Sequence, residues 1–149
     1  MLELLEAFQN YIRPEGYELV DQPTSVLSQL HKGFIFRHRE DSTRLIVKLG
    51  GTNRSYDEKT VPEIRLGKVK KKRVVTNRNL HPSEVHEDVV EKFYSLARMY
   101  GARQDGDNLA LVFYDTEYFR RELDPLRPAL ERLGIAVYLV GENKAVTKF

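Results

Sequence analysis

Two apolar runs, at residues 109–114 and 135–140, dominate the C-terminal part of the chain. A strand that is apolar at every position is buried on both faces, which is typical of a parallel sheet covered by helices on both sides. The charged segment between the runs has helical spacing and ends at Gly134. The pattern therefore predicts a parallel β-α-β unit over 109–140, and we expect the core of the fold there.

Helical spacing of apolar residues predicts helices at about 2–13, at 82–100 and over 116–133. The last of these contains Pro125, which cannot lie inside a helix without removing a backbone hydrogen bond and clashing with the preceding turn. Asp124 and Pro125 instead suit a cap followed by a first helical residue. We therefore expect a helix in two pieces, divided at this dipeptide.

Short runs rich in β-branched, aromatic and other apolar residues predict strands at 17–20, 34–39 and 44–49. The short polar stretch 40–43 suits a hairpin connection between antiparallel neighbours. Together with the β-prone residues that follow, these strands predict an antiparallel meander over about 17–75.

Four features complicate the meander. Residues 25–31 fit either a helical turn or a strand, and the polar stretch 50–59 is too long for a tight turn, so it is predicted to be a mobile loop. Residues 61–66 and 69–75 are β-prone. Pro62 lacks a backbone donor, so the first of these segments is predicted to be an edge strand or to begin irregularly. The predicted fold is α/β or α+β, with a mixed sheet that joins the meander to the β-α-β unit.

Length and composition narrow the class of protein. A chain of 149 residues fits one domain, 1–149, whose core is large enough to be stable without disulfides or a structural metal ion. It has no cysteine, which excludes disulfides and thiolate zinc sites. The first six residues have no basic start and include two acids, which does not suit a signal peptide or a membrane span. A cytoplasmic protein without a membrane partner is expected.

The net charge of +2 hides an asymmetry, because residues 1–80 carry 15 Lys and Arg against 10 Asp and Glu, and residues 81–149 carry 9 against 12. Most of the excess lies between 65 and 78, a stretch without any acid. Its basic residues are Arg65, Lys68, Lys70, Lys71, Lys72, Arg73 and Arg78. Such a density of positive charge releases counterions from a phosphate backbone. The leading prediction is a nucleic-acid-binding protein that uses this segment, with DNA binding or RNA binding both left open.

Two other interpretations fit the same charges. Lysines on an edge strand protect a sheet from edge-to-edge aggregation, so the segment could be a solvated surface hairpin. The chain would then be a non-catalytic interaction or assembly module, in which exposed apolar edges pair between subunits to form homo-oligomers.

A third interpretation is a small DNA-processing enzyme. The predicted order of elements is loosely similar to that of restriction-endonuclease-like folds, in which two acids and a lysine hold a divalent cation and a water. This chain departs from their acid-x-lysine pattern, because Ile46 precedes Lys48 by two positions and Arg65 follows Glu63. Many α/β proteins share the order of elements. The residues that could contribute to such a site are Glu6, Asp41, Lys48, Asp57 and Glu63.

No cofactor is expected apart from Mg²⁺ in this enzymatic variant. His81 and His86 are five residues apart, so they do not share a helix face well and suit polar contacts near a helix start. His31 and His38 would face opposite sides of a regular strand. The acidic loop 115–117 lies where parallel sheets bind ligands, but its charge would repel phosphate.

Overall fold

The structure is a computed structural model. It describes residues 2–20, 33–50, 56–65, 68–77 and 81–149, and for Leu2 and the two ranges within 56–77 it describes only the course of the backbone. The described chain forms a six-stranded mixed sheet with helices on both faces, which confirms the predicted fold class.

The central sheet joins an antiparallel part to a parallel part. Its strands, in their order across the sheet, are β1 (Tyr17–Leu19), β2 (Phe34–His38), β3 (Arg44–Leu49), β6 (Asn108–Tyr114), β7 (Ile135–Val140) and β8 (Val146–Lys148). Strands β3, β6 and β7 are parallel, while β1 and β2 on one side and β8 on the other are antiparallel to their neighbours. The two edges of the sheet are therefore strands of three residues each.

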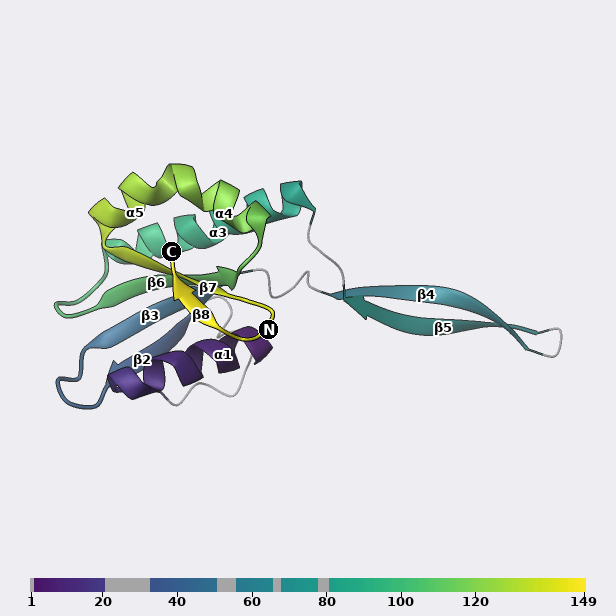
Figure 1. The fold of residues 1–149 in the computed structure, drawn as a ribbon, viewed down its shortest axis with the longest axis horizontal. Helices are drawn as coiled ribbons and strands as arrows, with labels where there is room; N and C mark the ends of the chain where they lie inside the picture. The colour runs from purple at the N-terminus through teal and green to yellow at the C-terminus, as the bar shows by residue number, and fades with distance from the viewer. Residues whose placement is uncertain (1, 21–32, 51–55, 66–67, 78–80) are drawn as a thin grey trace.

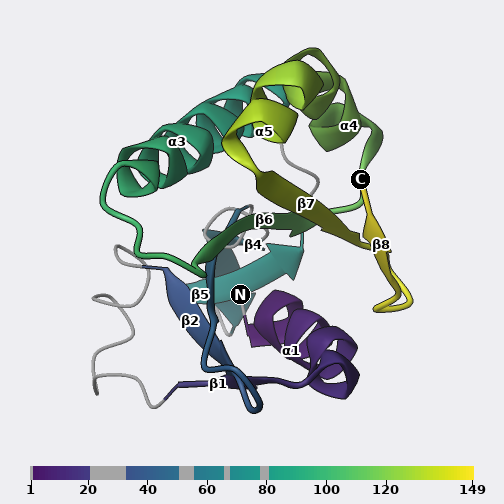
Figure 2. The same cartoon turned by 90° about the vertical axis from the view of Figure 1, so that its left-hand side faces the viewer.

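Helices cover the sheet unequally (Figures 1 and 2). One face carries α1 (Leu2–Ile12), which a short 3-10 turn at Arg13–Glu15 extends. The other face carries α3 (Pro82–Tyr100), α4 (Glu117–Leu123) and α5 (Arg127–Leu133). None of the helices in the described ranges is long and apolar enough to cross a membrane.

Strand β6 is the centre of the core, because both of its faces are buried. Leu109, Leu111 and Phe113 face the cluster formed with α3, α4 and α5. Ala110 and Val112 face the cluster formed with α1. This alternation explains why the run is apolar at every position, and it confirms the prediction that the core lies in the β-α-β unit.

The connection from β6 to β7 is a helix in two pieces, as predicted. Thr116 caps α4 by accepting a hydrogen bond from the Phe119 amide at 3.3 Å. The helix then changes to a 3-10 turn at Asp124–Leu126 and continues as α5. Gly134 ends it with a φ of 65°, a left-handed conformation that favours glycine.

The C-terminal residues dock on the body. The Phe149 amide donates to the Val137 carbonyl at 2.8 Å, and the Arg127 guanidinium lies 3.8 Å from the centre of the Phe149 ring. Strand β8 pairs with β7, and Phe149 packs against the core cluster, so the tail is held to the sheet.

Strands β4 (Tyr56–Arg65) and β5 (Lys68–Asn77) form a sheet of their own, which corrects two predictions. The meander of the central sheet ends at residue 49 and not at about 75. The predicted loop over 50–59 is wrong for 56–59, which is strand; residues 51–55 and the ambiguous segment 25–31 lie outside the described residues.

The apolar pattern explains why the two strands leave the sheet. Only one of their ten register pairs, Ile64 with Val69, joins two apolar residues. Every pair between β6 and β7 is apolar or aromatic on both sides. A ribbon without a continuous apolar face gains little from burial against the core, and Figure 1 shows it reaching away from the sheet and helices.

An ion pair joins the starts of the parallel strands β3 and β6. Arg44 donates two hydrogen bonds to Asp107, at 2.9 and 2.6 Å, and the Asp107 side chain is only 3% exposed. The hydrogen bond from Arg44 holds the pKa of Asp107 below its ordinary value of 3.8. The carboxylate also accepts a hydrogen bond from the Gln104 amide.

Asp107→Asn should lower the free energy of unfolding by about 2 kcal/mol at pH 7. The change removes the charge of a buried carboxylate that accepts charge-assisted hydrogen bonds from Arg44. The pKa of Asp107 is lowered by folding, so its contribution is complete above the ordinary pKa and is lost as the pH falls through the folded value. Denaturant unfolding at pH 7 and pH 3 measures both effects. The exposed neighbour is the control: Asp105→Asn should change little, and an equal loss in the two variants would contradict the role given to Asp107.

Candidate nucleic-acid interface

We call the β4–β5 ribbon the arm. Its register runs without interruption from Tyr56 opposite Asn77 at the base to Arg65 opposite Lys68 at the tip. Ten residues of extended chain span roughly 30 Å. The arm is therefore a narrow, two-stranded projection on the body.

The formal charge of the arm is concentrated at its tip. Residues 60–73 hold six Lys or Arg and one acid, Glu63, whereas Asp57, Glu58 and Lys59 lie close to the base. All of the predicted interface residues except Arg78 fall in the distal part, and Arg78 lies outside the described residues. The arm thus brings together six cations that the sequence had shown only as neighbours along the chain.

Both ends of the arm connect to the body at the end of the sheet where the parallel strands finish. The Gly50 amide, directly after β3, donates to the Val112 carbonyl of β6 at 2.9 Å, so the chain leaves at the carboxyl ends of the parallel strands. It returns at His81, whose ring accepts a hydrogen bond from the Ser83 amide and caps α3. The prediction of a polar contact for His81 at a helix start is confirmed.

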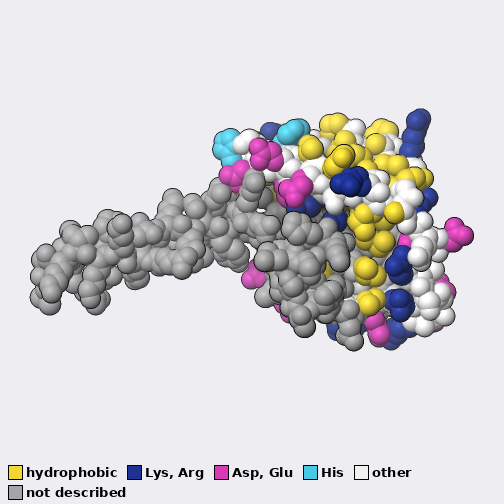
Figure 3. Space-filling model, turned by 180° about the vertical axis from the view of Figure 1, so that it is seen from behind, with side chains coloured by type: hydrophobic (Ala, Val, Ile, Leu, Met, Phe, Trp, Pro, Cys, Tyr) yellow, Lys and Arg dark blue, Asp and Glu magenta, His cyan; other side chains and the backbone are white. Residues whose placement is uncertain are grey.

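The body beside this attachment is acidic. The first half of α3 carries Glu84, Glu87, Asp88 and Glu91. Figure 3 shows acidic and histidine side chains gathered on the body next to the arm. His86 contacts Glu122 of α4 at 2.7 Å, an ion pair between the helices when the histidine is protonated. The formal charge is therefore negative on the body beside the base of the arm, which we call the root, and positive at the tip.

Lys48 is buried near the arm attachment, with 3% of its surface exposed. Burial lowers the pKa of Lys48, and the nearby ammonium of Lys92 lowers it further, while Glu91 opposes the shift. Lys92 lies 3.7 Å from Asp88 and 3.2 Å from Glu91. Both ion pairs lie within α3, and the effects of Lys92 and Glu91 on the pKa of Lys48 show that the end of β3 lies close to the middle of α3.

The structure does not bring the predicted nuclease residues together where it describes them. Glu6 is exposed on α1, which covers the opposite face of the sheet from α3. Asp41 lies in the turn before β3, at the other end of the strand from Lys48, and accepts hydrogen bonds from Thr43. The side chains of Asp57 and Glu63, in β4, lie outside the description. Within the described ranges, no three His, Asp or Glu side chains are grouped to hold a metal ion.

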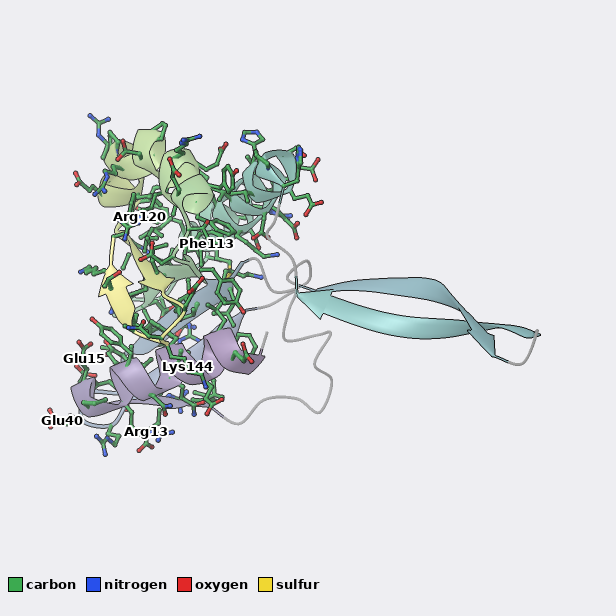
Figure 4. All side chains as sticks on the ribbon, turned by 45° about the vertical axis from the view of Figure 1, so that its right-hand side comes forward. Arg13, Glu15, Glu40, Phe113, Arg120 and Lys144 are labelled. Atoms are coloured by element: carbon green, nitrogen blue, oxygen red, sulfur yellow. The ribbon has the colours of Figure 1, made fainter. Side chains whose placement is uncertain are left out.

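The end of the body away from the arm has charges of both signs. Figure 4 places Arg13, Glu15 and Glu40 there.

The acidic loop after β6 contains an ion pair, in which Asp115 accepts two hydrogen bonds from Arg120, at 2.7 and 3.0 Å. The hydrogen bond from Arg120 lowers the pKa of Asp115. Asp115 is thus paired with an arginine of the helix that follows the loop.

Sequence reasoning missed the group around Gly50, Asp88 and Lys92. The spacing of Asp88 and Lys92 by four residues predicts their ion pair. Their proximity to Lys48 has no sequence signal, because the arm separates the two segments along the chain.

The chain has no match among protein-family models, curated proteins or solved structures. The arm and its attachment therefore have to be interpreted from their own geometry and charge.

Gly50→Ala should destabilise the fold by about 1–3 kcal/mol, because an added methyl group overpacks the attachment. Its Cβ would clash with the Phe113 ring and lie 2.7 Å from Oδ2 of Asp88. Gly101→Ala is the matched control, since a Cβ there meets nothing within 4 Å and the φ of −70° suits any residue. Thermal unfolding of both variants tests the difference. Equal melting temperatures would contradict the close contact at Gly50.

Proposed function

We propose that the protein binds nucleic acid through the outer part of the arm, residues 60–73. The observation that carries the proposal is the combination of shape and charge: a ribbon of ten residue pairs whose tip holds six cations and one acid. Six cations along a narrow projection suit a phosphate backbone, whose affinity comes from counterion release. The proposal gives the body the role of a rigid support.

The acidic root supports a particular placement of the ligand. Residues 84–92 of α3 carry four acids and one lysine, so phosphates that approach this part of the helix meet a negative formal charge, whereas phosphates at the tip meet lysine and arginine. Interactions between exposed charges fall off within about 10 Å at 0.1 M salt. The ligand is therefore expected to lie across the outer part of the arm and away from the body.

The alternative is an assembly module that forms homo-oligomers. One observation favours it: β4 and β5 each have an outer edge that no strand in the described ranges covers. Pro62 removes one donor from the β4 edge and the lysines of β5 repel a second copy, so both edges carry features that prevent strand addition. Edge protection by itself does not account for the separation of basic tip from acidic root. We therefore place nucleic acid first.

Binding to a labelled duplex should weaken steeply with salt. If all six distal cations contact phosphate, log K should fall with log salt at a slope of up to about −5. Changing Lys70, Lys71 and Lys72 together to Glu should make the slope shallower by about 3 and abolish most of the affinity. A fluorescence titration over a salt series measures both quantities.

The control for this variant reverses three exposed cations of the body, Arg13, Arg132 and Lys144. The two triple variants have the same net charge, so a loss specific to the arm cannot come from net charge. No binding by the wild type at low salt, or equal losses in the two variants, would contradict the proposal. Sedimentation of the free chain tests the alternative, which requires an oligomer that the arm variant disrupts.

Neutralising the root should have the opposite effect. Glu87→Gln with Glu91→Gln removes two exposed negative charges beside the arm, so affinity for the duplex at low salt should rise by about two- to threefold. The control is Glu131→Gln with Glu142→Gln, which makes the same change in net charge on exposed residues of α5 and of the turn before β8. An equal rise in both variants would show a net-charge effect and contradict the repulsive role given to the acids at the root.

A further inference from the structure

The shape and composition of the arm narrow the class of nucleic acid, and this inference rests on the proposed function. The arm is two extended strands wide, and adjacent strands lie about 5 Å apart. The major groove of B-form DNA is about 12 Å wide and admits a two-stranded ribbon. We propose that the ligand is duplex DNA and that the arm enters its major groove.

Single strands lack a matching surface on the arm. Proteins that bind single-stranded nucleic acid stack the bases on aromatic side chains, at roughly 1–3 kcal/mol per base. Residues 57–77 contain no Phe, Tyr, Trp or His, and the arm's single aromatic residue, Tyr56, is at the base, away from the basic tip. The tip therefore offers charge to a single strand but no aromatic ring on which its bases can stack.

Double-stranded RNA has the phosphate charge but not the groove. The major groove of A-form RNA is deep and narrow, so a ribbon would contact only phosphates on its outside. A duplex of RNA should therefore bind by charge alone and lose the contacts that insertion provides.

The composition of the tip also indicates low sequence specificity. Lysine binds phosphate as a point charge, whereas arginine can pair with guanine through two hydrogen bonds. Four of the six distal cations are lysines, and the two arginines, Arg65 and Arg73, are eight positions apart on different strands. The arm is thus suited to hold a duplex by its backbone and to read few of its bases.

A comparison of matched ligands tests the inference with the full chain. Each ligand is about 20 base pairs or nucleotides long, roughly twice the length of the arm at 3.4 Å per base pair. Four ligands are titrated at one ionic strength: duplex DNA, each of its two single strands, and duplex RNA of the same sequence. Duplex DNA should bind about tenfold more tightly than the other three. Equal or tighter binding of a single strand or of duplex RNA would overturn the inference and leave the proposed function standing.

Two further ligands test entry into the major groove. Bulky substituents at C5 of the pyrimidines project into the major groove and should weaken binding about tenfold. A small molecule that fills the minor groove should leave binding unchanged. Unchanged affinity for the substituted duplex, or competition by the minor-groove ligand, would contradict insertion. Failure of every ligand to bind at low salt would instead overturn the proposed function itself.

Discussion

Burial of β6 on both of its faces is the constraint on which the rest of the structure depends. A strand without a polar face needs an apolar layer on each side, and α1 supplies one layer while α3, α4 and α5 supply the other. Its neighbours β3 and β7 are parallel to it, so the carboxyl ends of all three strands lie at the same end of the sheet. The chain leaves β3 at this end and returns to α3 beside it. The position of the arm therefore follows from the packing of β6.

The arm and the body divide two physical roles. The body holds the apolar residues, and its attachment point is fixed by close contacts at Gly50, where even a methyl group would meet Phe113 and Asp88. The arm has one apolar register pair among ten and most of the excess positive charge. A segment that contributes so little apolar surface to the core is explained better by what it presents to a partner than by the stability of the fold. Under the proposed function, the acids of α3 restrict where a nucleic-acid ligand can lie.

The fold was predictable where burial sets a local period. The apolar runs of β6 and β7, the spacing of α3 and the break at Asp124 and Pro125 all leave a sequence signal, because each depends on residues close together in the chain. The separation of the arm from the sheet has a weaker signal, the lack of an apolar face in both strands, which the prediction of one continuous meander overlooked. The group of Lys48, Asp88 and Lys92 could not be predicted, since it depends on how α3 crosses β3.

Hydrogen–deuterium exchange of the full chain, with and without duplex DNA, tests the central claim most directly. It reports on every segment at once, so the location of the interface does not depend on the choice of variants. Slower exchange on binding is expected within residues 56–77, with little change in α4, α5 and β8. Binding that slows exchange in α4, α5 or β8 and leaves 56–77 unchanged would contradict the assignment of the interface to the arm.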